Sequence, residues 1–266
     1  MVLTLTETMT VKRTCIITLA LASVLAIGGC GTGPEPQAAR TGQGMTLDEV
    51  RRYRSELVGG ALDVSLLRIR NMDYPVMSSP EELAATQQTV AGGVVDGWQQ
   101  GPATASYPGG PLEYRVVMRV RITDPLKGAT GKPHMPEDTA YIEFDQGAVI
   151  RDDPKPAEEW KPEKSVSDFE ASIPTGTKVV VFLRARPPYE QKIVHPGQPL
   201  PAGARIMSLP PQGLILEDSK LSARRNSDTS ALVGGLEPLE DGGPAWLESK
   251  TVHDLVARLK SKGISD

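Results

Sequence analysis

Hydrophobic and polar residues alternate most regularly in the middle of the chain, between Glu113 and Asp124. Every second side chain is apolar and the positions between are mostly charged, which is typical of an antiparallel strand with one buried and one wet face. The apolar face would consist of Tyr114, Val116, Met118, Val120 and Ile122. The turn-forming sequence at 124–128 predicts the end of this strand.

A second pattern, the uninterrupted apolar run from Val179 to Leu183, predicts a strand that is buried on both faces and lies centrally in a sheet. Residues 100–112 have the glycine and proline content of a long turn. Shorter apolar stretches predict further strands at 62–69, from 93 onward, and at 140–144, 205–209 and 213–216.

Helical periodicity is confined to the two ends of this β-rich region and one short stretch within it. A T-x-x-E capping box at 46–49 begins an N-terminal helix, and Ser79 followed by proline begins a short one. Thr251 begins a C-terminal helix at about 251–262, whose apolar residues follow the i, i+3, i+4, i+7 rule. The predicted fold class is therefore mainly β with flanking helices (α+β).

The N-terminal residues have the organisation of an export signal. Lys12 and Arg13 are followed by an uncharged apolar run at 16–27, which is shorter than the roughly 20 residues of a bilayer-spanning helix. Met9 lies just before the basic pair and is an alternative start to Met1. By themselves these features fit a cleaved signal peptide or a short membrane helix.

The next residues decide between these readings. Ile27-Gly28-Gly29-Cys30 resembles the lipobox of bacterial lipoproteins, in which two small residues precede the cysteine that receives diacylglycerol. The resemblance implies that residues 1–29 are removed and that Cys30 carries the membrane anchor, which two acyl chains make stable. It implies a flexible tether at 30–45 and a single β-rich domain at 46–266, lipid-anchored on the extracytoplasmic face of the cell membrane.

Charge and cysteine content narrow the function further. Removal of two basic residues and one acidic residue with the signal leaves 27 basic and 32 acidic residues, a net charge of −5, which argues against nucleic acid as a partner. Cys15 leaves with the signal, so Cys30 is the only cysteine of the mature chain and no disulfide or catalytic thiol is expected. The 26 glycines, 23 prolines and 5% aromatic residues favour a loop-rich β protein.

The polar face of the central strand carries the main candidate binding residues. Arg115, Arg119 and Arg121 lie two to four residues apart on that face, so they could clamp a carboxylate or a phosphate. The alternative is an ordinary role for these side chains, solvated or paired across the sheet with Glu143 or Asp145. The sequence favours the second reading.

The other candidate metal-binding and catalytic residues have weaker support in the sequence. His134 and His195 occupy proline-bounded loops and could meet the carboxylates at 137–138, but their spacing matches no recurring ligand set, so no metal and no cofactor is expected. The acidic pairs at 152–153 and 158–159 lie in a lysine-rich loop, where solvated charge is the default. The sequence contains no nucleophile elbow and no glycine-rich phosphate loop.

Residues Thr89 to Asp218 resemble the bacterial exported domains related to the netrin and tissue-inhibitor-of-metalloproteinase module. The resemblance rests on the strand start VAGGVVDGW, on the LKG sequence at 126–128 and on G-x-K-x-x-V-F-L at 176–183. It implies an antiparallel, OB-like β-barrel with a core at about 89–218, on which the N-terminal and C-terminal helices pack. The zinc-directed inhibition of the animal members does not carry over, because it needs a free N-terminal cysteine.

These features predict a membrane-anchored envelope lipoprotein whose domain binds a protein or a small anionic ligand without catalysis. The first alternative is an envelope hydrolase that uses carboxylates or a His/Asp/Glu metal site. The second is a spacer lipoprotein without a small ligand.

Overall fold

A computed structural model describes residues 61–68, 73–223 and 230–266 of the chain. All of these residues belong to one unit, Gly44–Asp266. The export signal, Cys30, the tether and the helix expected from the capping box at 46–49 lie outside the described residues.

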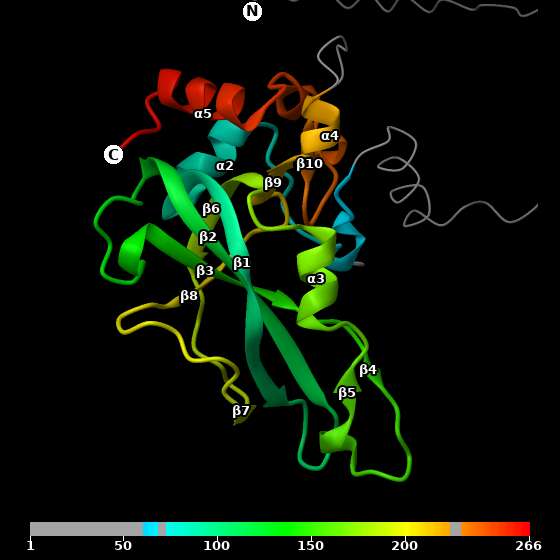
Figure 1. Cartoon of the computed structure of the whole chain (residues 1–266). Helices are drawn as coiled ribbons and strands as arrows, with labels where there is room; N and C mark the ends of the chain where they lie inside the picture. Colours follow the sequence, from blue (N-terminus) through cyan, green and yellow to red (C-terminus); the bar gives the residue numbers. More distant parts are fainter. Residues whose placement is uncertain (1–60, 69–72, 224–229) are drawn as a thin grey trace, which may run out of the picture. The chain divides into compact units, whose positions relative to one another are not determined.

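An eight-stranded, mostly antiparallel sheet dominates this mixed α+β unit (Figure 1). Its strands lie in the order β10-β9-β6-β8-β3-β2-β1-β7, in which β3 and β8 are parallel. β4 and β5 form a separate two-stranded sheet. The bounds are β1 Thr89–Ala105, β2 Leu112–Lys127, β3 Thr139–Asp145, β4 Val149–Ile150, β5 Lys161–Pro162, β6 Lys178–Ala185, β7 Ile193–His195, β8 Ile206–Ser208, β9 Leu214–Glu217 and β10 Leu232–Gly234.

The large sheet closes partly on itself, because β6 pairs with β1 in addition to β8 and β9. Residues 89–94 of β1 pair with 178–183 of β6 along one edge, while β2 occupies the other edge of β1. β1, β2, β3, β8 and β6 therefore form a partial ring. The three residues of β8 are its shortest side.

β6 is buried on both faces, as its uninterrupted apolar run predicts. Val179, Val181 and Leu183 belong to the hydrophobic core inside the ring, whereas Val180 and Phe182 belong to a second core on the other side of the strand. All five side chains are 0% exposed. A strand between two cores needs apolar residues at every position, which explains the absence of alternation.

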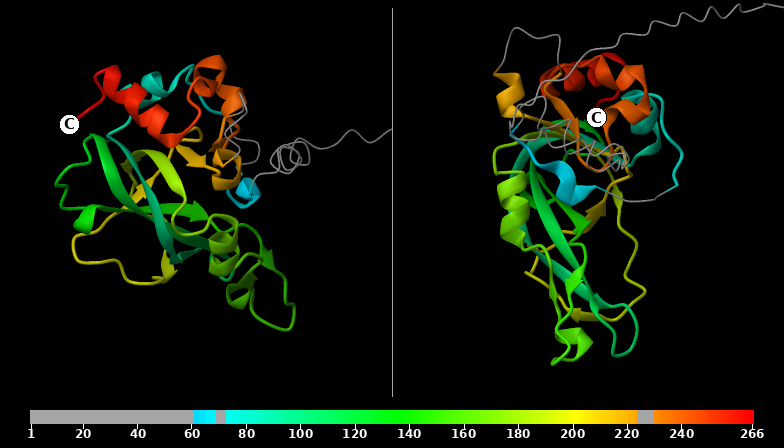
Figure 2. Two further views of the ribbon diagram at one scale, coloured as in Figure 1. Left: turned by 45° about the horizontal axis from the view of Figure 1, so that its top comes forward. Right: turned by 90° about the vertical axis from the view of Figure 1, so that its right-hand side faces the viewer.

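Helices α2 (Pro80–Thr86) and α5 (Val252–Ser261) cover the second core together (Figure 2). Ser79 caps α2 with proline at the first helical position, and Thr251 begins α5 with a capping box, so both helix predictions are confirmed. Arg258 of α5 joins the two helices, because its Nε lies 2.5 Å from Oε1 of Glu81 in α2. α5 buries Val252, Leu255, Val256 and Leu259.

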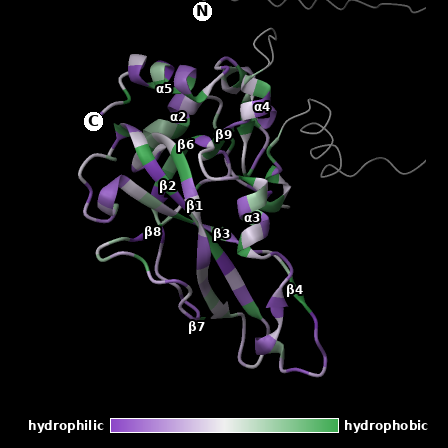
Figure 3. Ribbon diagram, viewed as in Figure 1, coloured by the Kyte–Doolittle hydropathy of each residue, from purple (hydrophilic) through white to green (hydrophobic). Residues whose placement is uncertain are grey.

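β2 shows the predicted alternation, visible as bands of colour along the ribbon in Figure 3. It also continues through Asp124-Pro125 to Lys127, so the predicted break at 124 is wrong. The register shifts between β1 and β2 next to the proline, which lacks an N–H group to donate. The strand ends where Gly128 adopts a positive φ of 58°.

The long turn expected at 100–112 is also wrong. β1 continues to Ala105 and β2 begins at Leu112, and these two residues are register partners. The strand tolerates Gly101-Pro102 because the register shifts there, and a bulge leaves the proline outside the regular ladder. The turn is therefore confined to 106–111.

The start of the described chain is helical instead of extended. The strand expected at 62–69 is replaced by the 3-10 helix η1 (Val64–Leu67), because the carboxylate of Asp63 accepts a hydrogen bond from the N–H group of Ser65 at 2.9 Å. Helix α3 (Val166–Ser172) is an addition to the expected elements. The remaining short helices are η2 Pro136–Asp138, η3 Ala157–Glu159, α4 Ser219–Ser222, η4 Leu239–Gly242 and η5 Pro244–Leu247.

Candidate functional site

The three arginines of β2 share one face of the strand, as the alternation predicts. Their register partners on β3 are Asp145 for Arg115, Tyr141 for Arg119 and Thr139 for Arg121. This face is not uniformly wet, because Val117 between the first two arginines is only 1% exposed. The segment that connects β6 to β8 supplies side chains to this face.

Arg115 lies in a cluster centred on Glu143, the register partner of Val117. The Glu143 carboxylate, 7% exposed, accepts a hydrogen bond from Nε of Arg186 at 2.6 Å and one from the hydroxyl of Tyr189, and lies 3.7 Å from Nε of Arg115. The Arg186 guanidinium also stacks on the Tyr189 ring, 3.7 Å from its centroid. Burial and the bond to Glu143 raise the pKa of Tyr189, so its hydroxyl remains a donor.

Arg115 also forms the cross-strand ion pair that the sequence favours. Its Nη1 lies 3.4 Å from Oδ2 of Asp145, and its Nη2 lies 2.9 Å from Oε2 of Glu113. Three carboxylates therefore surround one guanidinium. Arg115 serves internal acids and has little capacity left for an external anion.

Arg119 and Arg121 have different surroundings. Nη2 of Arg119 donates to the carbonyl oxygen of Asp96 at 3.2 Å, and its Nε lies 3.8 Å from the Asp96 carboxylate. Arg121 is exposed, and its side chain has no partner within the described part of the chain. The structure thus keeps the three predicted residues on one face but gives each guanidinium a separate environment.

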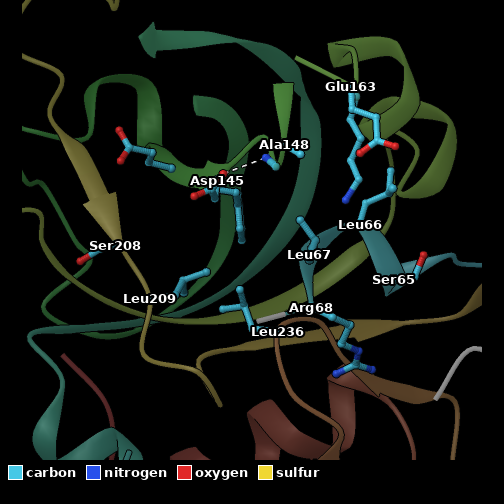
Figure 4. A pocket seen from close by; sticks show the side chains of 14 residues that line it. Ser65, Leu66, Leu67, Arg68, Asp145, Ala148, Glu163, Ser208, Leu209 and Leu236 are labelled. Carbon is cyan, nitrogen blue, oxygen red and sulfur yellow. Dashed lines mark hydrogen bonds between the residues drawn. The ribbon is translucent and has the colours of Figure 1, made fainter. Parts of the chain in front are cut away.

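A cavity of about 610 Å³ lies beside the edge of β3, and Glu143 is one of its lining residues. This volume falls within the usual range of small-molecule sites, about 300–1,000 Å³. Its lining comes from η1, the end of β3 with the loop that follows it, the residues before α3, the end of β8, and Leu236 after β10. Five distant segments therefore converge on one hollow (Figure 4).

One wall of the cavity is apolar and continuous with the core inside the ring. Leu67, Leu209 and Leu236 lie side by side on this wall (Figure 4). Leu67 and Leu236 are buried members of that core, and Leu209 packs against it. A ligand with an apolar group would remove this wall from water, which stabilises binding by about 25 cal/mol per Å².

Several charged groups of the cavity already have partners within the protein. Glu143 is held by its two arginines, and Asp145 pairs with Arg115 while its Oδ1 accepts a hydrogen bond from the N–H group of Gly147 at 2.7 Å. Glu163 is exposed. Glu143 and Asp145 are therefore paired with arginines before any ligand arrives.

Lys164 and Ser208 are two lining residues whose polar groups have capacity to spare. The ammonium of Lys164 has no ion-pair partner among the described residues, and it lies next to Gly147, where an added Cβ would be 3.6 Å from Nζ. The hydroxyl of Ser208 is buried without a hydrogen-bond partner in the same residues. The cavity thus combines an apolar wall with two cationic side chains, Arg68 and Lys164, and one buried, unused hydroxyl.

The two loop histidines do not meet. His195 lies in β7, which pairs with the C-terminal end of β1, whereas His134 follows the C-terminal end of β2, which pairs with the N-terminal end of β1. They therefore lie at opposite ends of the hairpin. Burial and the nearby charges of Arg205 and Lys132 lower the pKa of His134, so it is neutral at pH 7.

The acidic pairs have the ordinary surroundings expected of a charged loop. Asp152 lies 2.5 Å from Nζ of Lys155, Asp153 pairs with Arg151, and the pair at 158–159 is exposed. In residues 61–68, 73–223 and 230–266, no group of three or more His, Cys, Asp or Glu side chains could hold a metal ion. The metal version of the hydrolase hypothesis therefore finds no support there.

The cavity is the feature that sequence reasoning missed. Its residues come from segments up to 171 positions apart, Ser65 to Leu236, and no local spacing links them. The capping box Ser165-x-x-Asp168 was an available signal for α3, whose start follows Lys164 directly.

Comparisons with known proteins add no relatives. The chain matches no protein-family model, no curated protein and no solved structure. No helix within the described ranges is both long and apolar enough to cross a membrane.

Proposed function

We propose that this protein is a lipid-anchored lipoprotein of the cell envelope whose domain binds a small anionic ligand in the cavity beside β3. The observation that carries the binding proposal is the combination of an apolar wall with the unpaired ammonium of Lys164 in a hollow of about 610 Å³. The proposed activity is binding without catalysis.

The anchor rests on the sequence Ile27-Gly28-Gly29-Cys30 behind its basic and apolar signal. Diacylglycerol on Cys30 would hold the protein at the extracytoplasmic face of the cell membrane, since two acyl chains bind a bilayer stably whereas one binds marginally. The polar residues at 31–44 would give a root-mean-square reach of roughly 20 Å. A ligand or a partner protein in the envelope is then accessible to the domain.

The ligand chemistry follows from the groups that remain unsatisfied. A carboxylate would pair with Lys164, and the hydroxyl of Ser208 would supply a further hydrogen bond. An apolar group attached to that carboxylate would cover the leucine wall. Because Glu143 and Asp145 are paired with arginines, they do not repel such a ligand as free carboxylates would.

The test uses octanoate as the anionic probe and octanol as its uncharged counterpart, with binding to the full-length protein followed by amide NMR. Octanoate should shift the signals of residues 143–148 and 208–209 saturably. Lys164→Gln should weaken octanoate binding about tenfold, which corresponds to 1.4 kcal/mol, and leave octanol binding unchanged.

Lys161→Gln is the matched control, because Lys161 is a lysine three positions earlier that is exposed and does not line the cavity. Equal effects of the two lysine variants on octanoate would contradict the assigned role of Lys164. Absence of saturable binding by both probes would reject the cavity as the ligand site.

We also infer that the domain is related to the OB-like barrels of the netrin and tissue-inhibitor-of-metalloproteinase module. The partial ring of β1, β2, β3, β8 and β6 supports this interpretation, as do the LKG sequence at the end of β2 and the G-x-K-x-x-V-F-L sequence that leads into β6. An experimental structure in which these five strands do not close would contradict it.

A further inference from the structure

The loop after β2 binds a carboxylate with consecutive backbone groups. The N–H groups of Gly128, Ala129 and Thr130 all donate to the side chain of Asp266, with distances of 3.1 Å from Ala129 and 2.8 Å from Thr130. Thr130 and Asp266 are 136 positions apart in the sequence. Three successive donors aimed at one anion form a backbone nest, the arrangement that proteins use to hold carboxylates and phosphates.

The conformation of the nest is stabilised by residues other than Asp266. Gly128 has a φ of 58°, a conformation that favours glycine, and a Cβ at this position would collide with the carbonyl oxygen of Gln88. Just before it, Nζ of Lys127 donates to the carbonyl oxygens of Ala84 and Ala85 at 2.9 and 3.1 Å. Contacts that do not involve Asp266 therefore fix the start of the nest at Lys127 and Gly128.

Asp266 is a weakly packed occupant of this site. Ser265 and Asp266 are exposed, and of the residues that follow α5 only Ile264 packs against the second core. Residues 265–266 therefore gain their position largely through the carboxylate of Asp266. An occupant of this kind can leave without disturbing the core.

Cations lie close to the same loop. The charges of Lys132 and Arg205 both act on His134, and the N–H group of Arg205 donates to the carbonyl oxygen of His134 at 3.1 Å. Lys132 lies two positions after Thr130 and is exposed. A larger anion seated on the nest would therefore find an ammonium within the same loop.

We propose that the N–H groups of Gly128, Ala129 and Thr130 form an anion-binding site for a carboxylate or phosphate group, and that Asp266 occupies it as an internal competitor. This site is separate from the cavity beside β3, and the proposal does not depend on the proposed function. A tethered competitor acts at an effective concentration in the millimolar range, so an external anion must exceed that level or carry additional contacts.

The experiment compares the full-length protein with Asp266→Ala and Asp266→Asn, using inorganic phosphate and acetate as probes at constant ionic strength. Amide NMR reports the N–H signals of residues 128–130 directly. In Asp266→Ala, phosphate or acetate should shift these three signals saturably, with an apparent affinity about tenfold or more above that of the unchanged protein. Asp266→Asn should also raise the apparent affinity for the probe anion, because an uncharged amide competes for the nest less strongly than a carboxylate does.

A second variant tests the donors. Thr130→Pro in the Asp266→Ala background removes one N–H group and should weaken anion binding at the remaining two. If that double variant does not fold, the signals of Asp266→Ala alone decide. Absence of saturable shifts at 128–130 in Asp266→Ala with both probes would overturn the proposal, as would equal affinities with and without Asp266.

Discussion

Nε of Arg186 donates a hydrogen bond of 2.6 Å to Oε1 of Glu143, a carboxylate that is only 7% exposed. This contact joins the segment after β6 to the middle of β3, and it places a cation over the polar face of the β1–β2–β3 sheet. Val117, the register partner of Glu143, is buried although it lies on a face predicted to be wet. The contact also neutralises one of the acids that line the cavity.

The first prediction concerns this ion pair. Arg186→Ala should lower the free energy of unfolding by about 2–4 kcal/mol, because Glu143 would keep its buried charge with one cation fewer. Chemical denaturation of the two proteins measures the difference. Arg184→Ala removes an exposed arginine near the end of β6, two residues before Arg186, and should change stability by less than about 0.5 kcal/mol. Equal losses in the two variants would contradict the structural role of the pair.

The second prediction concerns the core inside the ring. Trp98 packs against Phe144 and Phe169 with ring centroids 5.8 and 5.4 Å away, and its Nε1 donates to the carbonyl oxygen of Ile173 at 2.9 Å. Trp98→Phe retains an aromatic ring but leaves that buried carbonyl unpaired, so it should cost about 1–3 kcal/mol in unfolding free energy.

Trp160→Phe is the matched control for Trp98. Its indole nitrogen donates to the carbonyl oxygen of Asp152 in the partly exposed loop between β4 and β5, where water can replace the bond. Urea denaturation followed by circular dichroism should therefore show a smaller loss than for Trp98→Phe. A larger loss for Trp160→Phe than for Trp98→Phe would contradict the assignment of the main aromatic stabilisation to the cluster of Trp98.

The third prediction concerns pH. A hydrogen bond from the side chain of Thr130, together with bonds from the backbone N–H groups of residues 128–130, lowers the pKa of Asp266 from 3.8 to about 2. Because the folded-state pKa is below the unfolded one, the contact stabilises fully above pH 3.8 and loses its effect as pH falls through about 2. Asp266→Asn should therefore reduce stability at pH 6, and the difference should shrink at pH 2.

Denaturant unfolding at pH 6, 4 and 2 measures that difference. Glu170→Gln serves as a control, because Glu170 is an exposed acid of α3 without a partner in the described ranges. Its effect should be small at each pH. A stability difference for Asp266→Asn that stays constant from pH 6 to pH 2 would show that its carboxylate charge is not what the nest binds.

The elements that sequence reasoning found are those whose pattern is complete within a few residues. β2 alternates, β6 is apolar throughout, and α5 repeats its apolar residues with a helical period after Thr251, so each carries its own signature. The errors lie where pairing decides the outcome. Gly101-Pro102 has the composition of a turn, yet β1 runs through it because a bulge in its pairing with β2 accommodates the proline.

The candidate site shows the same division. Period-two alternation placed three arginines on one face, and cross-strand partners for Arg115 could be named because β3 is nearby in sequence. The contacts of Arg186 and Tyr189 with Glu143 could not be predicted from the sequence, because they depend on the path of the segment that follows β6. The cavity is formed by segments that lie still further apart in the sequence, so local residue spacing could not predict it.

The central claim is that Cys30 anchors this protein to the membrane through lipid. Mass spectrometry of the N-terminal peptide of the mature protein, combined with membrane fractionation, tests it directly. The sequence predicts a chain that begins at Cys30 and carries a diacylglyceryl adduct, lost together with membrane association in Cys30→Ala and retained in Cys15→Ala. A mature protein with an unmodified Cys30 that fractionates away from the membrane would contradict the account.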